Sequence, residues 1–493
     1  MFERITPENA GVQSSEVKRF IDYLNDNSYS IHSLLLLRDG KIFTEAYWKP
    51  FNKDFLHRQY SQTKSFVGIA IGLLVSDGLL SLDDKIIDLF PEKIDDINAT
   101  PDRLKNQTVR DMLTMTTVGE HKWWFRESDP DRTHMYLNDR KTARIPGAIW
   151  EYDSAGSQVL SSLVEKLSGM PIFDFLYSRL FSHMGTFKTA RMLKTPNGNT
   201  WGDSAMLCTT RDMASFAQLL LDGGRWQGEQ LIDERYVKEA TSRLVNNSEN
   251  KECNVFSHGY GYQIWRAPRD GFAFVGMGTQ LTVVIPSKRL IFSINSDTQG
   301  APSDYDVIVN GFLSFIADRA SDSALPEAPK DYEALDKTIN GLELFALKGG
   351  DGTALKEKIN ERTYVCEPNE LGMTRFEFAF DGDCGEFRYT NRQGDKILPF
   401  GINKNVFGKF PELGYSDEVG REVTTNGHMY SDAVSLRFAE DGKLQMKVQI
   451  IDKYFGNFTA TFAFVGDEAE CLFTSKAENF LTEYHGTFMA KQA

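Results

Sequence analysis

The sequence predicts an α+β protein in two parts, first helices mixed with antiparallel strands and then a region made mostly of strands. Three observations carry this prediction. A nearly unbroken apolar run at Phe66–Val75 predicts a buried helix, amphipathic helical patterns recur on both sides of it, and apolar segments separated by Asp-Gly turns dominate the chain beyond residue 370. At 493 residues the chain is long enough for two or more domains.

The first part opens with a helix and a hairpin. Residues 14–27 carry apolar side chains at helical spacing. Ser33–Arg38 and Lys41–Trp48 then flank Asp39-Gly40, which is the signature of a two-residue hairpin turn. An antiparallel sheet is therefore expected to begin before the apolar helix.

The apolar helix at Phe66–Val75 is expected to lie in the core. It is shorter than the roughly 20 residues that a membrane-spanning helix needs. Ser76-Asp77-Gly78 follows it and predicts its end, because Gly78 can adopt the left-handed conformation common after helices.

Further helices and strands complete the first part. Thr108–Leu113 opens a helix, an amphipathic pattern follows Gly156, and a helix at 304–319 is expected to pack on the sheet. The remaining expectations are helices after Ser81, at 172–183 and at 210–222, strands at 260–265 and 271–275, and a hairpin of 281–285 with 290–295.

The second part is separated from the first by a linker. Residues 321–330 are rich in Ser, Asp, Ala and Pro, so the expected domains are 1–320 and 331–493. The second domain is expected to be a mostly antiparallel β sandwich or barrel. It offers no nucleophile beside a base, so a structural or substrate-shaping role is expected. Its clearest strands are at 376–380, 434–438, 444–450 and 459–465.

Composition argues against several function classes. The formal charge of −14 disfavours binding to nucleic acid or to anionic membranes. No stretch suits a transmembrane helix and Met1–Glu8 lacks the features of a signal peptide, so a cytoplasmic location is expected. Five cysteines and eight histidines show no metal-ligand spacing, so reduced thiols, no metal and no cofactor are expected.

Ser61 and Lys64 are the strongest candidates for chemistry. They stand three residues apart at the start of the apolar helix, so the hydroxyl and the amine can approach each other on one helical face. A serine becomes a good nucleophile when a neighbouring base takes its proton, and burial can lower the pKa of a lysine enough for that task. Such pairs also occur on ordinary solvated helices, so the flanking sequence decides between the two interpretations.

Several short segments around this pair share a pattern. They are Tyr60–Phe66, Gly78–Asp84, Met112–Thr117, Tyr152–Gly156, Thr210–Ala214 and Tyr260-Gly261-Tyr262. Together they resemble the serine β-lactamase and penicillin-binding-protein superfamily, in its class C-like branch of esterases, peptidases and amide hydrolases. The resemblance covers about residues 10–320 and implies a β-lactamase-like catalytic domain, with an antiparallel sheet flanked by helices plus a helical subdomain.

The resemblance also implies roles for individual residues. Ser61 would be the acylated nucleophile, Lys64 its proton acceptor or electrostatic partner, and Tyr152 the phenol that shuttles the proton. The oxyanion hole would use the backbone N–H of Ser61 and one from the strand that carries Gly278-Thr279-Gln280. The side chain of Gln280 is expected to be structural rather than catalytic.

Two departures from the family pattern narrow the expected substrate. Ser154 stands where an asparagine is frequent in the second motif, and it is expected either to bind substrate or to cap the following helix. Val275–Gln280 lacks the cation that many relatives use to bind a substrate carboxylate and looks more like the version in amide hydrolases of the nylon-oligomer type. A true β-lactamase or D,D-peptidase is therefore disfavoured.

An aromatic segment at residues 121–147 is expected to be a long functional loop. Trp124, together with His121 and Trp123, either lines the substrate cleft or packs back onto the core.

These observations predict a serine hydrolase that acts through an acyl-enzyme on a small-molecule ester or amide, without metal or cofactor. Two alternatives stay open: an acyltransferase on the same Ser61, Lys64 and Tyr152 site, and a non-catalytic binding or sensor protein that kept the fold.

Overall fold

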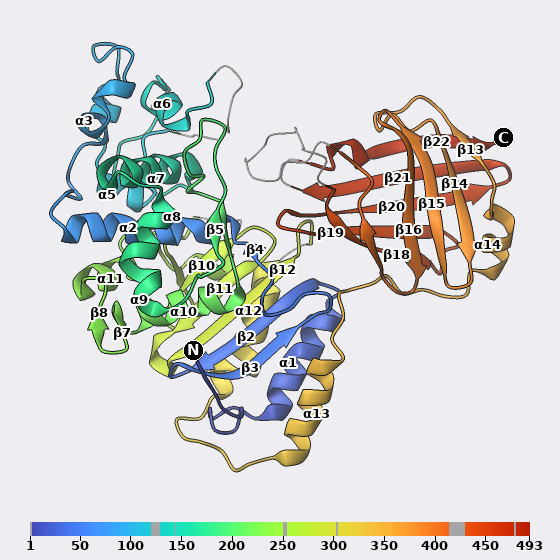
Figure 1. Ribbon diagram of the computed structural model, residues 1–493, viewed down its shortest axis with the longest axis horizontal. Coiled ribbons are helices and arrows are strands. Elements are labelled where there is room, and N and C mark those ends of the chain that lie inside the picture. The colour runs from blue at the N-terminus through green and yellow to red at the C-terminus, as the bar shows by residue number, and fades with distance from the viewer. Residues whose placement is uncertain are drawn as a thin grey trace. The chain divides into compact units, whose positions relative to one another are not determined.

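The computed structural model describes residues 2–119, 129–141, 143–249, 254–301, 304–413, 429–477 and 480–493. These residues form two compact units (Figure 1). The first contains the chain up to Ser296 and Ala301–Glu343. The second contains Asp297–Gly300 and the described residues from Leu344 onward.

The first unit is organised around a sheet of seven strands among the described residues. Strand β2, from the beginning of the unit, pairs with β12, from near its end, so segments far apart in the sequence lie side by side in the middle of the sheet (Figure 1). The β2–β3, β9–β10, β10–β11 and β11–β12 pairs are antiparallel, as predicted, whereas the short edge strand β1 runs parallel to β3, which the prediction did not include. In order across the sheet the strands are β1 (Glu3–Arg4), β3 (Lys41–Tyr47), β2 (Ser30–Arg38), β12 (Leu290–Asp297), β11 (Gln280–Ile285), β10 (Gly271–Gly276) and β9 (Trp265–Ala267).

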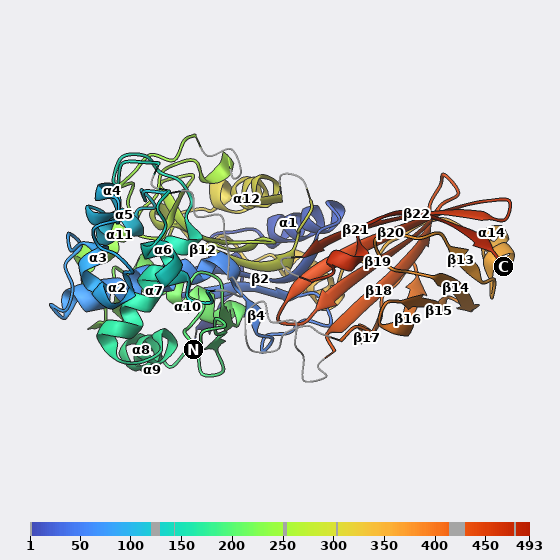
Figure 2. The same ribbon diagram turned by 90° about the horizontal axis from the view of Figure 1, so that it is seen from above.

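Both faces of this sheet are covered, which explains the unbroken apolar run in β2. Leu34 and Leu36 pack into one core with side chains of α1 (Ser14–Asp26), α12 (Asp304–Phe315) and α13 (Pro329–Asn340). Leu35 and Leu37 point to the opposite face and join a second core. Figure 2 shows α1 and α12 on one side of the sheet. The predicted β2–β3 hairpin is confirmed, with Asp39 and Gly40 both at positive φ.

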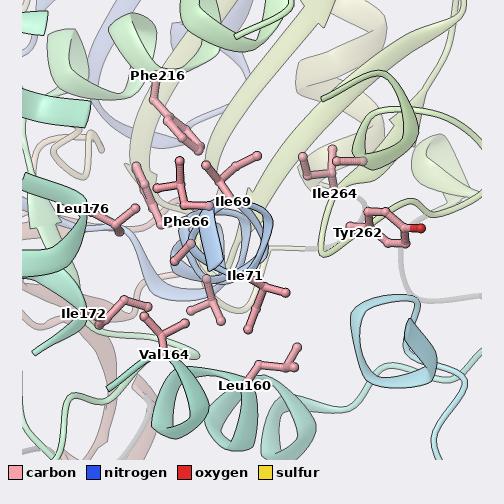
Figure 3. Packing of buried hydrophobic residues seen from close by; sticks show 14 of the residues in the cluster. Phe66, Ile69, Ile71, Leu160, Val164, Ile172, Leu176, Phe216, Tyr262 and Ile264 are labelled. Atoms are coloured by element: carbon pink, nitrogen blue, oxygen red, sulfur yellow. The ribbon is translucent and has the colours of Figure 1, made fainter. Parts of the chain in front are cut away.

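The second core surrounds α2 (Thr63–Ser76), whose residues from Thr63 to Leu74 are all buried. A helix that is apolar on all sides needs neighbours on all sides. Figure 3 shows these neighbours, with Leu160 and Val164 from α7 (Ser154–Ser168) and Phe216 from α10 (Thr210–Leu221) directed at α2. The predicted buried helix is confirmed.

Short helices and small sheets fill the rest of the first unit. Thr108 and Thr209 begin α5 and α10 with capping boxes. The helix predicted at 172–183 is interrupted by a π-helical turn at Tyr177–Phe181. The remaining elements are α3 (Ile86–Leu89), α4 (Asp102–Lys105), α5 (Val109–Leu113), α6 (Arg132–Leu137), α8 (Ile172–Leu176), α9 (Ser182–Met184), α11 (Glu234–Ala240), β4 (His57–Arg58), β5 (Arg191–Met192), β6 (Met206–Cys208), β7 (Arg225–Trp226) and β8 (Glu229–Gln230).

Two local predictions were wrong. The segment expected to be one long loop at 121–147 contains α6 within its described part. The strand expected at 260–265 is a bend that becomes β9 only at Trp265. At this bend Gln263 has φ +59° and is buried, and its Nε2 donates hydrogen bonds to the carbonyls of Met112 and Leu113. Satisfying this buried amide outweighs the local strand pattern.

The second unit is a closed sheet of ten strands among the described residues. Neighbouring strands are antiparallel apart from a parallel β16–β18 pairing, which closes the sheet into a barrel. The mostly antiparallel β domain is therefore confirmed. Its elements are α14 (Thr353–Ile359), β13 (Tyr364–Cys366), β14 (Arg375–Asp381), β15 (Cys384–Asn391), β16 (Gly394–Ile402), β17 (Val406–Lys409), β18 (Ser431–Phe438), β19 (Leu444–Ile451), β20 (Phe455–Val465), β21 (Glu468–Ala477) and β22 (Gly486–Gln492).

Within the described ranges of both units, no helix is long and apolar enough to cross a lipid bilayer.

Candidate active site

A tight turn presents Ser61 at the start of α2. Tyr60 adopts a left-handed conformation with φ +45°, and Tyr60–Gln62 form a single 3-10 turn that runs into α2. Strand β10 packs directly against this turn, since a Cβ on Gly276 would lie 2.3 Å from the carbonyl oxygen of Gln59. The missing side chain at Gly276 therefore lets the edge of the sheet approach the serine.

Lys64 lies one turn after Ser61, and its amine reaches the serine hydroxyl. The distance from Lys64 Nζ to Ser61 Oγ is 2.9 Å, and Nζ also donates to the backbone carbonyl of Asp203 at 2.7 Å. The side chain of Lys64 is only 2% exposed. A lysine this deeply buried is held in one position, in contrast to a solvated surface lysine.

Tyr152 completes the predicted set from a distant part of the chain. Its ring centroid lies 5.0 Å from Lys64 Nζ. The turn that carries it is fixed by Asp153, whose carboxylate accepts hydrogen bonds from the Gly156 N–H at 3.0 Å and from Thr117 Oγ1 at 2.7 Å. The structure thus brings Ser61, Lys64 and Tyr152 together.

The hydrogen bonds of this turn show whether Ser154 caps the following helix, which was one of its two expected roles. Asp153 is the N-cap of α7, and Ser154 is the first residue of the helix. The capping alternative for Ser154 was therefore wrong, and its contribution to substrate binding stays a prediction.

Aromatic side chains surround Tyr152. Its ring stacks on Trp265 with centroids 5.6 Å apart, and Trp150 contacts Trp265 at 5.4 Å and Tyr260 at 5.7 Å. Burial, followed by the nearby Tyr152, raises the pKa of Tyr260 well above its usual value, so Tyr260 stays neutral. We call Trp150, Tyr152, Tyr260 and Trp265 the aromatic cluster.

The turn between β10 and β11 supplies the third predicted segment. Gly278 and Thr279 both have positive φ, at +69° and +57°. The side chain of Thr279 is buried and donates to Asp304 at 2.8 Å, while Gln280 Nε2 donates to the carbonyls of Met277 and Gly278 at 3.3 and 3.2 Å. These side chains brace the turn, and the expected role of its backbone N–H groups in an oxyanion hole stays a prediction.

A buried amide network joins this turn to the segment before Ser61. Asn295 Nδ2 donates to Gln280 Oε1 at 2.9 Å and to Gln59 Oε1 at 3.2 Å. Sequence reasoning missed both Asn295 and Gln59. The available signal was an amide side chain at the end of the mostly apolar strand pattern at Leu290–Asn295, because a buried amide needs a partner.

Sequence reasoning also missed an ion pair behind Lys64. Arg132 Nη1 and Asp203 Oδ1 are 2.7 Å apart, with both side chains at most 1% exposed, and Asp203 Oδ2 lies 4.0 Å from Lys64 Nζ. Arg132 is on the short helix α6 and Asp203 is in a loop, so no periodic pattern marks either residue.

Trp124, His121 and Trp123 lie outside the described residues. Across the described ranges, His, Cys, Asp and Glu side chains form no group of three or more that could hold a metal ion.

Comparison with known proteins identifies the family. The family model named Beta-lactamase matches residues 32–309, which is more than half of the chain and includes Ser61, Lys64 and Tyr152. The chain belongs to the beta-lactamase family. This is a family of serine hydrolases with the β-lactamase fold, as the resemblance implied.

Curated relatives of this beta-lactamase-family chain include hydrolases. The chain is 25% identical over 221 residues to the 6-aminohexanoate-dimer hydrolase of Paenarthrobacter ureafaciens, a match that covers 42% of this chain and 56% of that enzyme. It is 21% identical over 384 residues to penicillin-binding protein 4* of Bacillus subtilis, covering 66% and 80% of the two chains. The first match therefore spans little more than half of the relative.

Solved structures share the fold. A putative 6-aminohexanoate-dimer hydrolase from Bacillus anthracis superposes with a TM-score of 0.54 at 17% identity, covering 66% of this chain and 89% of that one. EstCE1, described as a hydrolase with promiscuous acyltransferase activity, gives a TM-score of 0.50 at 14% identity, covering 60% and 98%.

Proposed function

We propose that this beta-lactamase-family protein hydrolyses a small ester or amide through an acyl-enzyme formed on Ser61. The observation that carries the proposal is the 2.9 Å contact between Lys64 Nζ and Ser61 Oγ, with the amine buried and placed beside the ring of Tyr152. A hydroxyl, an amine and a phenol that can share one proton are the groups that acyl transfer to serine requires.

In the acylation step, Ser61 Oγ attacks the substrate carbonyl carbon while its proton passes to Lys64 or Tyr152. The tetrahedral oxyanion accepts hydrogen bonds from the backbone N–H of Ser61 and from one N–H of the Gly278–Gln280 segment. The carbon–oxygen or carbon–nitrogen bond then breaks, and the leaving alcohol or amine takes the proton from Tyr152.

In the deacylation step, a water molecule gives a proton to the same pair and attacks the acyl carbon. The bond to Ser61 Oγ breaks, the serine recovers its proton, and the carboxylic acid leaves. Because Lys64 Nζ lies 5.0 Å from the centroid of the Tyr152 ring, the two residues act in this proposal as one acid–base pair.

The turn at Met277–Thr279 favours substrates without a carboxylate next to the scissile bond. It carries no cationic side chain, and Thr279 instead donates to the carboxylate of Asp304. A β-lactam or D-Ala carboxylate would find no ion-pair partner on this turn. The sequence similarity to a 6-aminohexanoate-dimer hydrolase supports an amide as the substrate class.

Labelling with a fluorophosphonate probe tests the proposal. The wild-type protein is expected to form a covalent adduct on Ser61, and Ser61→Ala is expected to form none. A screen of p-nitrophenyl esters, linear amides, D-amino-acid peptides and a chromogenic cephalosporin then ranks substrate classes. Absence of an adduct on the wild type would support the non-catalytic alternative, and equal labelling of Ser61→Ala would show that the probe reacts elsewhere; either result would overturn the proposal.

Acyl transfer to an alcohol or amine is a second candidate on the same site. The aromatic rings beside Tyr152 favour it, because apolar surroundings near an acyl group disfavour water relative to an organic acceptor. Product analysis with and without added alcohols separates the two: an ester product at low alcohol concentration indicates transfer, and acid alone indicates hydrolysis.

A further inference from the structure

Three charged side chains form a buried row behind Ser61. Arg132 pairs with Asp203 Oδ1 at 2.7 Å, and Asp203 Oδ2 lies 4.0 Å from Lys64 Nζ. Asp203 is fully buried, and its Oδ2 accepts no hydrogen bond from the described residues. A carboxylate oxygen removed from water is costly unless a charge faces it, and the Lys64 amine is the group that faces this one.

The loop that carries Asp203 is fixed on both sides. The N–H of Gly202 donates to Gln158 Oε1 at 3.0 Å. Arg58 donates through Nε to the carbonyl of Ser204 at 3.0 Å and through Nη2 to Ser204 Oγ at 2.9 Å. Strand β6 begins three residues after Asp203 and pairs with β4, which precedes Ser61. The carboxylate is therefore held in register with the serine turn.

Several other titratable groups near α2 have partners of their own. On α7, Asp153 caps its own helix and Glu165 accepts from Thr200 Oγ1. On α11, Tyr236 donates to the carbonyl of Gly68 at 2.6 Å. Before α2, the Arg58 guanidinium lies over the Tyr60 ring at 4.3 Å and is a third buried cation besides Lys64 and Arg132. Tyr152 and Asp203 are ionisable groups that the described residues place next to Lys64 Nζ.

We propose that Asp203 and Arg132 are positioning residues that set the protonation of Lys64 and hold its amine against Ser61. The proposal rests on the proposed function, since it assigns a role toward the same serine. The Asp203 carboxylate favours the ammonium form of Lys64, and the Arg132 guanidinium, by neutralising that carboxylate, opposes it. The balance between them lets the amine exchange a proton with the Ser61 hydroxyl.

This balance gives the two residues effects of opposite sign. Asp203→Asn keeps the backbone carbonyl and the side-chain volume but removes the negative charge, so the ammonium form of Lys64 is destabilised. Arg132→Met removes the compensating cation, so the ammonium form is stabilised. A role in packing alone would weaken the protein in both variants without moving a titration in opposite directions.

The pH dependence of the fluorophosphonate labelling rate reports the protonation of Lys64 in each variant. In Asp203→Asn, the acidic limb of the rate profile is expected to move to lower pH by about 1 unit or more, the size typical of a charge this close. In Arg132→Met it is expected to move to higher pH, and the double variant is expected to lie between the two. Arg132→Lys keeps the charge and is expected to restore most of the wild-type profile.

Glu45→Gln is the matched control. Glu45 is another buried carboxylate, bound by Arg211 at 2.6 and 2.7 Å between β3 and α10, and its removal is expected to leave the acidic limb in place. Circular dichroism checks that each variant is folded. If Arg132→Met does not fold, the proposal is tested by the shift of the acidic limb in Asp203→Asn alone.

The outcomes separate this proposal from the proposed function. Unmoved limbs, or limbs that move in the same direction, with Ser61 still labelled, would overturn the role of Asp203 and Arg132 and leave the hydrolase intact. A wild-type protein that shows no label on Ser61 would overturn both.

Discussion

Replacing Gly276 with alanine tests whether the approach of β10 positions the nucleophile. The new Cβ would lie 2.3 Å from the carbonyl oxygen of Gln59, two residues before Ser61, and 3.2 Å from Gln280 Cβ. Because the first neighbour is backbone, it cannot rotate away. Ordinary contact begins near 3.4 Å, so the strand and the serine turn must separate by about 1 Å.

A displacement of this size is large for catalysis. A misplacement of about 1 Å can cost about 10²-fold in rate, so Gly276→Ala is expected to lower the fluorophosphonate labelling rate of Ser61 by about that factor. Gly341→Ala is the control, because a Cβ there meets its nearest neighbour at an ordinary 3.5 Å and φ is −92°. A folded Gly276→Ala protein that is labelled within about threefold of the wild-type rate would refute the reasoning.

Three further perturbations follow from the same structure. Tyr152→Phe is expected to slow labelling and ester turnover by about 10²–10⁴-fold if the phenol transfers the proton, and unchanged rates would remove that role. Gln263→Leu would remove the side-chain amide that is hydrogen-bonded to the Met112 carbonyl and the Ser157 hydroxyl. We therefore expect the free energy of unfolding, measured with urea, to fall by about 2–5 kcal/mol, and a fall below about 0.5 kcal/mol would contradict this. Tryptophan fluorescence follows this loss, since all seven tryptophans lie between residues 48 and 265. Burial lowers the pKa of His57 to about 3, so its contribution to the free energy of unfolding is complete above about pH 6.5 and declines at lower pH by at most about 1.4 kcal/mol per pH unit. His57→Phe should therefore flatten the plot of the free energy of unfolding against pH between about pH 5 and 6. An unchanged slope of this plot would contradict the role of His57.

Elements with a strong local signal were predicted from the sequence. The Phe66–Val75 run specifies a helix that only a surrounded position can stabilise, and α2 occupies such a position. Asp39-Gly40 specifies the β2–β3 turn through two residues at positive φ. Strand β21 was missed, because its buried residues alternate with exposed ones in the structure but the exposed Leu472 is itself apolar and breaks the alternation in the sequence.

The residues of the candidate site also differ in how clearly the sequence marks them. Ser61 and Lys64 are neighbours along one helix, so their spacing alone places them together. Tyr152 was found through its motif. Arg132 and Asp203 carry no local pattern, and Asn295 is marked only as an amide in a predicted strand. All three reach the site because β12, α6 and the loop before β6 converge in the folded chain.

The central claim is that Ser61 carries the acyl group during turnover. Rapid acid quenching of the protein with a p-nitrophenyl ester, followed by mass spectrometry of the peptides, measures this directly. We expect the mass of the acyl group on the peptide that contains Ser61, and no such mass in Ser61→Ala. Ester turnover that persists in Ser61→Ala, or an acyl group found on another residue, would contradict the account.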